Sequence, residues 1–214
     1  MKILAISGSG RNERMTHNTL KKLLENCSDI FEIVSLVGKR INGCNGCTTC
    51  ATDNQCKVKD DWNEIGEKMK EADIIIFGAP NYFGTINSLS HATLERTFAF
   101  RHRSVYPLRD KLGVIVTTCE SRANEDPVAA YIKRMFDNNH MVTIGSMQVN
   151  QYNQCYTCGY GHDCVEGIVV RKNGILKEIL PCHFPLEVDF QEQTLKEIKN
   201  IRSILKNNGV KFND

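Results

Sequence analysis

Short apolar runs alternate with amphipathic segments along most of this chain of 214 residues. The apolar runs are nearly continuous, which is typical of parallel strands that are covered on both faces. They predict five strands, at residues 2–9, 31–37, 73–80, 112–119 and 141–149. Strands that alternate with helices imply a parallel sheet connected by right-handed crossovers.

The amphipathic segments predict the helices that connect and follow these strands. Leu20, Leu23 and Leu24 recur at helical spacing after the first strand. A second helix is expected to begin at Asp61, with Asp61 and Glu64 capping its first turn and Ile65 and Met69 on its apolar stripe. Two more helices are expected, one from Pro127 to Asn138 and one from Gln191 to Asn208 that Gly209 ends. The sequence therefore predicts an α/β fold with a flavodoxin-like, doubly wound, five-stranded parallel sheet.

The last third of the chain departs from this pattern. Residues 150–189 lack clean periodicity and are rich in Cys, Gly and Tyr, so we expect an irregular lobe there. We accordingly divide the chain into a flavodoxin-like domain at 1–149, with an inserted cysteine loop at 43–61, and a Cys-rich C-terminal extension with the final helix at 150–214.

Charge and hydropathy exclude several classes of function. Lys and Arg total 27 against 25 for Asp and Glu, so the net charge of +2 gives no electrostatic reason to bind nucleic acid. No apolar run approaches the roughly 20 residues of a membrane span, and Met1 leads directly into a strand rather than a signal peptide. We expect a cytoplasmic protein, in which ten cysteines indicate metal or redox use rather than disulfides.

Four of these cysteines lie close together in the segment from Gly43 to Asp61. Their spacing is C-x2-C-x2-C-x5-C, and such a compact run suits a cubane iron-sulfur cluster held from one side of a loop. Zinc sites more often use two separated C-x2-C pairs. We predict a 4Fe-4S cluster, with zinc or free structural thiols as the alternatives; the predicted ligands are Cys44, Cys47, Cys50 and Cys56.

The loop after the first strand has the composition of a phosphate site. The segment SGSGRNERMTHNT supplies backbone amides, hydroxyls and Arg11 immediately before a helix. Glu13 stands where a dinucleotide fingerprint requires its third glycine, and no Gly-Lys-Ser/Thr follows. A single phosphate is therefore favoured over a pyrophosphate, and an ordinary turn rich in Ser and Gly is the alternative.

Two further loops fall on the same predicted sheet edge. The segment GAPNYFG, Gly78 to Gly84, follows the third strand and offers amides and aromatic side chains to the edge and face of a flavin ring. Thr117, Thr118 and Cys119 end the fourth strand. A surface turn with incidental aromatic residues is the alternative for the first of these loops.

Several runs of the sequence resemble the iron-sulfur flavoprotein family, within the NADPH-dependent FMN reductase-like group. They are KILAISGSGR, HNTL, GCNGCTTC with Cys56 and KDDW, and FGAPNYFGTI. The resemblance covers about residues 1–120 and implies FMN, a 4Fe-4S cluster and a homodimer or homotetramer. One departure is a longer first loop, with residues 13–16 inserted. By the resemblance, the phosphate would be held by Ser7, Ser9, Arg11, His17, Asn18 and Thr19, and the flavin ring bordered by Pro80, Asn81, Tyr82, Phe83 and Gly84.

These features favour an FMN-dependent oxidoreductase that passes electrons between a one-electron donor such as ferredoxin and a small-molecule or protein acceptor. The cofactors carry the chemistry, so no catalytic side chain is predicted, and His91, His102 and His140 are interpreted as surface or core residues. One alternative is an NAD(P)H-dependent FMN or quinone reductase with structural cysteines. Another is a non-enzymatic redox sensor or carrier.

A second group of cysteines follows the fifth strand. CYTCGYGHDC repeats the two-residue spacing, and Gly159 and Gly161 permit tight backbone around it. A second iron-sulfur cluster, a zinc site, or structural or reactive thiols all remain open. The residues concerned are Cys155, Cys158 and Cys164, with Cys182 and Cys119 as possible companions.

Overall fold

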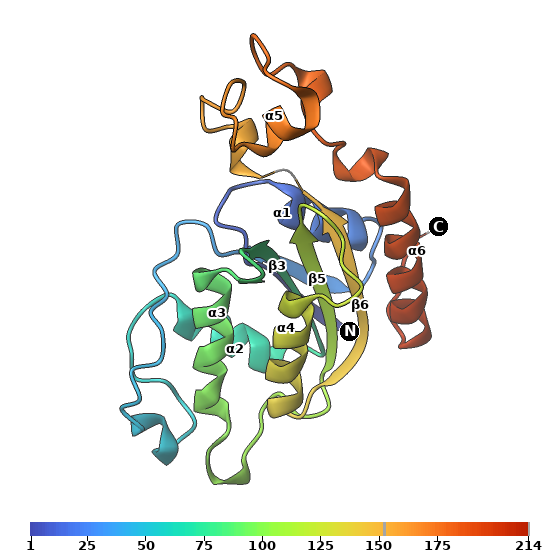
Figure 1. Ribbon diagram of the computed structural model, residues 1–214. Helices are drawn as coiled ribbons and strands as arrows, with labels where there is room; N and C mark the ends of the chain where they lie inside the picture. Colours follow the sequence, from blue (N-terminus) through green and yellow to red (C-terminus); the bar gives the residue numbers. More distant parts are fainter. Residues whose placement is uncertain (152, 214) are drawn as a thin grey trace.

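The computed structural model describes residues 1–151 and 153–213, and a parallel sheet lies at its centre (Figure 1). The strand order is β2-β1-β3-β5-β6, which confirms the flavodoxin-like prediction. A two-residue strand, β4, pairs with β3 in the antiparallel sense. The strands are β1 (Lys2–Ser7), β2 (Ile30–Ser35), β3 (Ile74–Tyr82), β4 (Thr85–Ile86), β5 (Leu112–Cys119) and β6 (Val142–Asn150).

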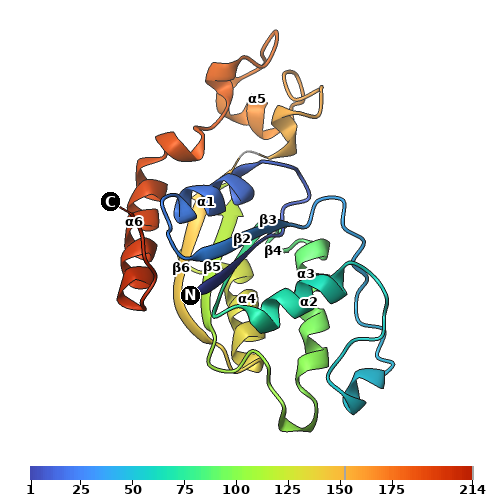
Figure 2. The same ribbon diagram turned by 180° about the vertical axis from the view of Figure 1, so that it is seen from behind.

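Helices cover both faces of the sheet (Figures 1 and 2). α1 (Met15–Leu24) and α6 (Glu192–Asn207) lie on one face, and α2 (Trp62–Glu71), α3 (Ser88–Glu95) and α4 (Pro127–Asn138) lie on the other. Each face has its own apolar core, because the strand side chains alternate between them. The two-layer covering explains why the central strands read as continuous apolar runs.

The helix α3 is absent from the sequence prediction. Its sequence, SLSHATLE, has only two leucines among small and polar residues, so it carries almost no amphipathic signal. Ser90 and Thr93 are nevertheless fully buried, because α3 is packed between the cysteine loop and α4. The missed helix matters for function, since it contacts both predicted cofactor regions.

The predicted cap of α2 by Asp61 is wrong. Asp61 has helical backbone angles and its side chain makes no capping bond; its carboxylate accepts the Arg40 amide at 2.6 Å instead. The neighbouring Asp60 accepts the Trp62 amide at 3.1 Å. Glu64 pairs with Lys68 at 2.8 Å, one turn along the helix. A run of two aspartates does not reveal which one faces the helix.

The start of α4 at Pro127 agrees with the prediction and is capped by Asp126. Its carboxylate accepts the amides of Val128 at 2.9 Å and Ala129 at 3.2 Å. We expect Asp126→Ala to lower the free energy of unfolding by about 1 kcal/mol, the usual cost of losing an N-cap. Urea unfolding measures this, with Asp137→Ala at the exposed end of the same helix as the control. An equal effect in both variants would contradict the capping role.

An irregular lobe follows β6 and stands beyond the carboxyl ends of the strands (Figure 1). It contains η4 (Gln154–Tyr156), α5 (Ile168–Asn173), η5 (Pro181–His183) and η6 (Val188–Phe190). The predicted irregular segment is confirmed here; Tyr152 within it lies outside the described residues. The chain then returns to the sheet, where Ile198, Ile201 and Leu205 of α6 enter the core. Gly209, at φ 92°, ends α6 as predicted.

The cysteine loop runs down the side of α3, in light blue to cyan in Figure 1. It contains one short helical turn, η1 (Thr49–Thr52), and lies against η2 (Arg96–Phe100) and η3 (His102–Ser104), which continue from α3. Among the described residues, no helix is long and apolar enough to cross a membrane.

Candidate functional site

A pocket opens at the carboxyl edge of the sheet, where the predicted flavin loops meet. β1 leads to Arg11, β3 to Tyr82 and Phe83, and β5 to Glu120, while the lobe supplies the opposite wall. This edge, between β1 and β3, is the switch point at which α/β sheets of this order bind ligands. The pocket is lined by Arg11, Asn81, Tyr82, Phe83, Glu120, Gln151, Asn153, Gln154 and Cys155.

The first loop turns tightly against β3 and α3. The Gly8 amide donates to the Gly78 carbonyl at 2.7 Å, and the Gly8 carbonyl accepts from Asn87 Nδ2 at 2.8 Å and Ser90 Oγ at 3.2 Å. A Cβ on Gly8 would lie 1.8 Å from Ser90 Oγ. Only glycine fits this position, and the start of α3 therefore fixes where the loop begins.

Two buried polar atoms beside this loop have no hydrogen-bond partner among the described residues: Ser7 Oγ and His17 Nδ1. Such atoms are costly to bury unless a ligand or water bonds them. Burial, reinforced by Lys21, lowers the pKa of His17, and Glu13 opposes this only in part. The Ser9 hydroxyl accepts the Arg11 amide at 3.1 Å and holds the loop bend. These two atoms without hydrogen-bond partners suit the phosphate of a mononucleotide.

The insertion of residues 13–16 that the resemblance implies falls where the first loop meets α1. α1 begins at Met15, so His17, Asn18 and Thr19 lie in the first turns of the helix rather than in the loop. Thr19 is buried and its hydroxyl donates to the Met15 carbonyl at 2.6 Å. The inserted residues are absorbed partly by helix and partly by Glu13, which takes a left-handed conformation at φ 44°.

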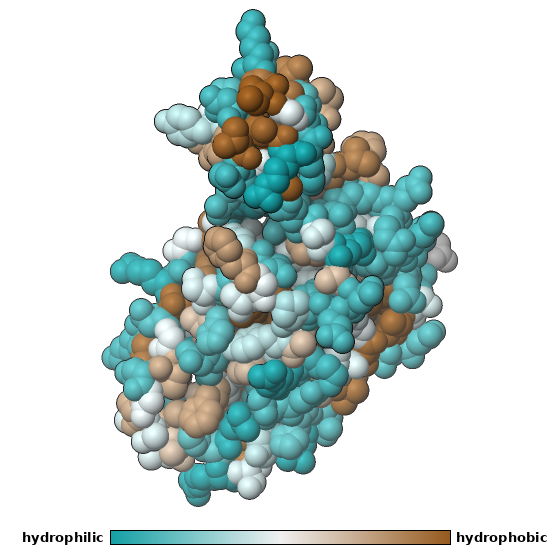
Figure 3. Space-filling view, in the orientation of Figure 1, coloured by the Kyte–Doolittle hydropathy of each residue, from teal (hydrophilic) through white to brown (hydrophobic). Residues whose placement is uncertain are grey.

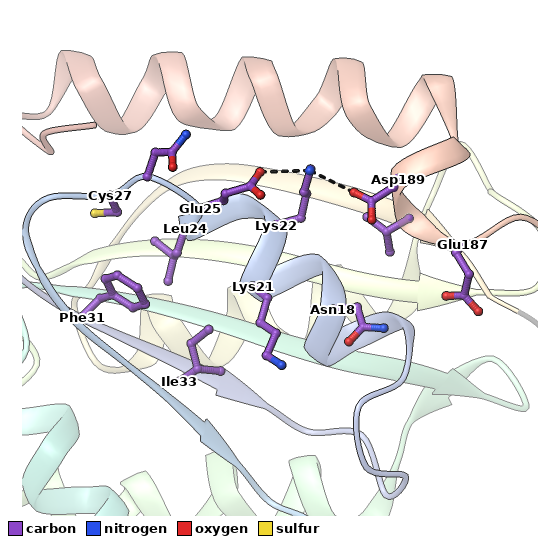
Figure 4. A pocket seen from close by; sticks show the side chains of 12 residues that line it. Asn18, Lys21, Lys22, Leu24, Glu25, Cys27, Phe31, Ile33, Glu187 and Asp189 are labelled. Carbon is purple, nitrogen blue, oxygen red and sulfur yellow. Dashed lines mark ion pairs between the residues drawn. The ribbon is translucent and has the colours of Figure 1, made fainter. Parts of the chain in front are cut away.

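Asn18 lines a different pocket from Arg11, between α1, β2 and η6 (Figure 4). Lys22 crosses that pocket and forms ion pairs with Glu25 and Asp189, both at 2.9 Å. Lys22, Glu25 and Asp189 are thus already paired with one another. The phosphate role predicted for Asn18 stays a prediction, since its side chain lies away from the carboxyl-edge pocket.

The second loop is a tight hairpin between β3 and β4. Phe83 and Gly84 both have positive φ, at 55° and 77°, as a two-residue type I′ turn requires. The Asn81 side chain accepts the Gly84 amide at 2.9 Å and stabilises the turn. Phe83 is fully exposed at its tip and Tyr82 is half-buried. Pro80 precedes the turn on β3, opposite Thr118 of β5.

The two threonines that end β5 are buried and point to different sides. Thr118 Oγ1 lies 3.0 Å from Thr16 Oγ1 and 3.0 Å from Gln151 Oε1, joining α1 to the start of the lobe. Thr117 donates to Asp126, the cap of α4. Thr118 therefore lies beside the pocket, whereas the Thr117 hydroxyl is already used by the fold.

The four cysteines of the predicted cluster motif line a single hollow together with Arg96 and Phe98. Cys44 and Cys47 are exposed, Cys56 is half-buried and Cys50 is buried. Burial, with the three neighbouring thiols, raises the pKa of Cys50, whereas the Thr49 hydroxyl, 3.1 Å from Cys47 Sγ, lowers the pKa of Cys47. Within residues 1–151 and 153–213, no group of three or more side chains is arranged to hold a metal ion.

Sequence reasoning missed two residues at this hollow. The Arg96 guanidinium is buried and donates to the Asn42 carbonyl at 2.8 Å and the Val58 carbonyl at 3.3 Å, one on each side of the cysteine run. His102 Nε2 lies 3.0 Å from Cys50 Sγ. Neither residue lies near the motif in sequence, so no spacing pattern could have revealed them.

Comparison with known proteins agrees with this geometry. Residues 1–154 match the NADPH-dependent FMN reductase family. An iron-sulfur flavoprotein of Methanocaldococcus jannaschii is 34% identical over 149 residues, which cover 68% of this chain and 76% of that protein. One of Archaeoglobus fulgidus is 36% identical over 121 residues, which cover 55% of this chain and 59% of that protein.

This chain belongs to the iron-sulfur flavoprotein family. It is an FMN-dependent oxidoreductase. Residues 8–14, called the phosphate loop from here on, and the carboxyl-edge pocket would suit the phosphate and the ring of FMN. A structural likeness supports the fold: FerB, an NAD(P)H:(acceptor) oxidoreductase of Paracoccus denitrificans, superposes with a TM-score of 0.56 at 14% identity, covering 98% of this chain and 99% of that one.

The second group of cysteines is only partly brought together. Cys155 lines the carboxyl-edge pocket, whereas Cys158, Cys164 and Cys182 are exposed on the lobe. Cys119 is buried at the end of β5, and burial raises its pKa to about 11. Cys119 is therefore an unreactive thiol at neutral pH. For the other four, a second iron-sulfur cluster, a zinc site, and structural or reactive thiols stay the alternatives.

Proposed function

We propose that this flavoprotein transfers electrons between a one-electron donor and an acceptor through a 4Fe-4S cluster on the cysteine loop and FMN at the carboxyl edge. The observation that supports this most directly is the hollow that Cys44, Cys47, Cys50 and Cys56 line together. Iron-sulfur clusters are held by four thiolates of this kind. The names of the family's relatives point in the same direction.

One helix connects the two regions. Ser90 of α3 bonds the phosphate loop at Gly8, and Arg96, at the end of the same helix, lies against the cysteine hollow. Six residues span about 9 Å along a helix. A rigid element of this length holds the two regions at a fixed separation, which favours electron exchange between them.

The protein's own residues bind the two cofactors and orient them. When bound, the cluster exchanges single electrons and FMN exchanges one or two. The Ser7 and His17 side chains and the loop amides hold the phosphate, and the β3–β4 hairpin borders the ring. Arg96 places a buried positive charge behind the thiolates, which stabilises their negative charge.

A reduced ferredoxin is the proposed donor. Arg103 is exposed beside the cysteine loop and donates to the Thr52 carbonyl at 3.2 Å. Lys59 is also exposed on this loop, whereas Lys57, which lines the hollow, is paired with Asp53. Positive charges around a redox centre favour an acidic electron-transfer partner and speed its association at low salt. These residues do not identify the acceptor, which is a small molecule or a protein.

Anaerobic reconstitution with iron and sulfide tests the proposal. We expect four irons per chain and faster flavin reduction by reduced ferredoxin than by NADPH. The alternative function, an NAD(P)H-dependent FMN or quinone reductase with structural cysteines, is supported by the family that residues 1–154 match. Flavin reduction by NADPH alone at the same rate, without iron, would establish that alternative instead.

Replacing Cys47 with Ala should remove the cluster and leave FMN bound. Cys47 lines the hollow, and none of the carboxyl-edge pocket comes from residues 43–61. Iron and flavin content of the purified variant measure the two losses separately, with Cys182→Ala on the lobe as the control. If flavin is lost in proportion to iron, the two sites form one folding unit and the proposal of separate sites is wrong.

We also propose a homo-oligomer, a dimer or a tetramer. Cys44 and Cys47 are exposed, so a cluster held there would be open to solvent unless a second copy covers it. Apolar side chains also gather on the lobe (Figure 3). Val165, Ile175 and Leu186 of the lobe are exposed. Sedimentation at micromolar concentration tests this; a monomer would overturn it.

A further inference from the structure

Cys155 is the one cysteine of the described chain that lines the carboxyl-edge pocket, where it shares the wall with Arg11, Tyr82 and Phe83. It begins the C-x2-C pair of the lobe, on the short helical turn η4. Cys155 is half-buried, whereas Cys158 is exposed. The pair therefore has one thiol toward the flavin pocket and the other toward solvent.

The chain brings the two residues close together. The Thr157 amide donates to the Gln154 carbonyl at 2.9 Å and closes η4, and Cys158 follows directly after this turn. Cys158 Sγ lies 3.6 Å from the Cys155 carbonyl oxygen. The Cys158 sulfur thus lies against the main chain of Cys155, and a disulfide between neighbours of this kind is compatible with the short span that such bonds bridge.

The surroundings of Cys158 leave its sulfur accessible. The Tyr160 amide donates to Cys158 Sγ at 3.4 Å and holds the side chain in place. Gly159 follows with φ 89°, so the chain turns sharply away and leaves the sulfur open to solvent. The nucleophile in disulfide exchange is an accessible thiolate.

The geometry of the turn favours this pair over a shared metal site. Cys164 and Cys182 are exposed, and Cys182 lies on a separate turn, η5. The lobe therefore presents Cys155 to the pocket, with Cys158 three residues further along the chain.

We propose that Cys155 and Cys158 form a redox-active dithiol that accepts electrons from the reduced flavin and passes them to a disulfide substrate. In the first step the Cys155–Cys158 bond breaks, and the two sulfurs gain two electrons from the reduced flavin and two protons, while the flavin is oxidised. The proposal rests on flavin binding in this pocket and is independent of the iron-sulfur cluster.

The second step regenerates the disulfide. The Cys158 thiolate attacks a sulfur of the substrate disulfide, one substrate thiol leaves, and a mixed disulfide forms. Cys155 then attacks Cys158, the mixed disulfide breaks, and the second substrate thiol leaves with the remaining proton. The outer position of Cys158 lets it meet a substrate as large as a protein, and the inner position of Cys155 keeps the restored bond beside the flavin.

Anaerobic reductive titration of the oxidised, flavin-loaded protein tests the proposal by counting electrons. We expect Cys155→Ser and Cys158→Ser each to take up two electrons fewer per chain than the wild type. Cys164→Ser, also on the lobe, should match the wild type. Mass spectrometry of the oxidised wild type should find residues 155 and 158 in one disulfide-linked peptide.

A second readout keeps this test separate from the proposed function. Thiol counting on flavin-free protein after mild oxidation should show the loss of two thiols in the wild type and in Cys164→Ser, and not in Cys158→Ser. An equal electron count in all variants, or iron or zinc in the lobe that Cys158→Ser removes, would overturn the dithiol. If the protein bound no iron-sulfur cluster, the wild type and every variant would instead take up fewer electrons by the same number, because none would go to iron.

Discussion

Replacing Arg96 with Met is expected to lower the free energy of unfolding by about 3–5 kcal/mol, the cost of leaving a buried charge without its partner. Arg96 is 1% exposed and its NH1 lies 2.9 Å from an Asp60 carboxylate oxygen, which is also buried. The guanidinium stacks over Trp62 at 5.0 Å and donates to carbonyls on both sides of the cysteine run. The change therefore also releases the loop that carries the predicted cluster ligands.

The pair has a definite dependence on pH. Burial alone would raise the pKa of Asp60, but hydrogen bonds from Arg96 and from the Asn42 amide hold it below its usual value. A carboxyl whose pKa is lower in the folded state stabilises the fold above its unfolded pKa, about 3.9, and this contribution is lost as the pH falls. The difference in stability between the wild type and Asp60→Asn should thus shrink in acid.

Urea unfolding of Arg96→Met at neutral pH measures the loss, with the exposed Arg103→Met as the matched control. The control should change stability by less than about 0.5 kcal/mol, as is usual for surface positions. The double variant Arg96→Met/Asp60→Asn should recover part of the loss, because no charge is then left buried. Equal effects of the two single arginine changes would show that burial of the pair contributes nothing.

The sheet could be predicted from the sequence because its strands are covered on both faces and carry long apolar runs. Leu112–Cys119 and Pro127–Asn138 occur with the predicted bounds. The number of strands favours the flavodoxin-like order, and the pairing of β1 with both β2 and β3 confirms this order. Motif spacing also indicated which four thiols line one hollow.

What the sequence did not reveal depends on contacts between distant segments. α3 carries too few large apolar residues to show a helical period, although Asn87 and Ser90 at its start bond Gly8. Arg96 lies 54 residues from Asn42 and 38 residues from Val58, whose carbonyls it binds on the two sides of the cysteine run. Neither contact leaves a local pattern, so only the folded chain shows how one helix serves both regions.

The same helix makes the first loop sensitive to a single methyl group, and Gly8→Ala is expected to weaken FMN binding strongly. Its Cβ would lie 1.8 Å from Ser90 Oγ and 2.9 Å from the Gly78 carbonyl oxygen, so either α3 or the loop must move. Overpacking of this kind costs about 1–3 kcal/mol, which corresponds to roughly a 5- to 150-fold rise in Kd if the loop alone moves.

Titration of the flavin-free protein with FMN measures this Kd, and the next glycine of the loop provides a matched control. A Cβ on Gly10 would meet no atom within 4 Å, so Gly10→Ala should bind FMN nearly as the wild type does. Adding Ser90→Gly to Gly8→Ala removes the shorter clash and should recover part of the affinity. The Gly78 carbonyl remains 2.9 Å away, so recovery should be incomplete. Equal loss of affinity in the Gly8 and Gly10 variants would mean that α3 does not position the phosphate loop.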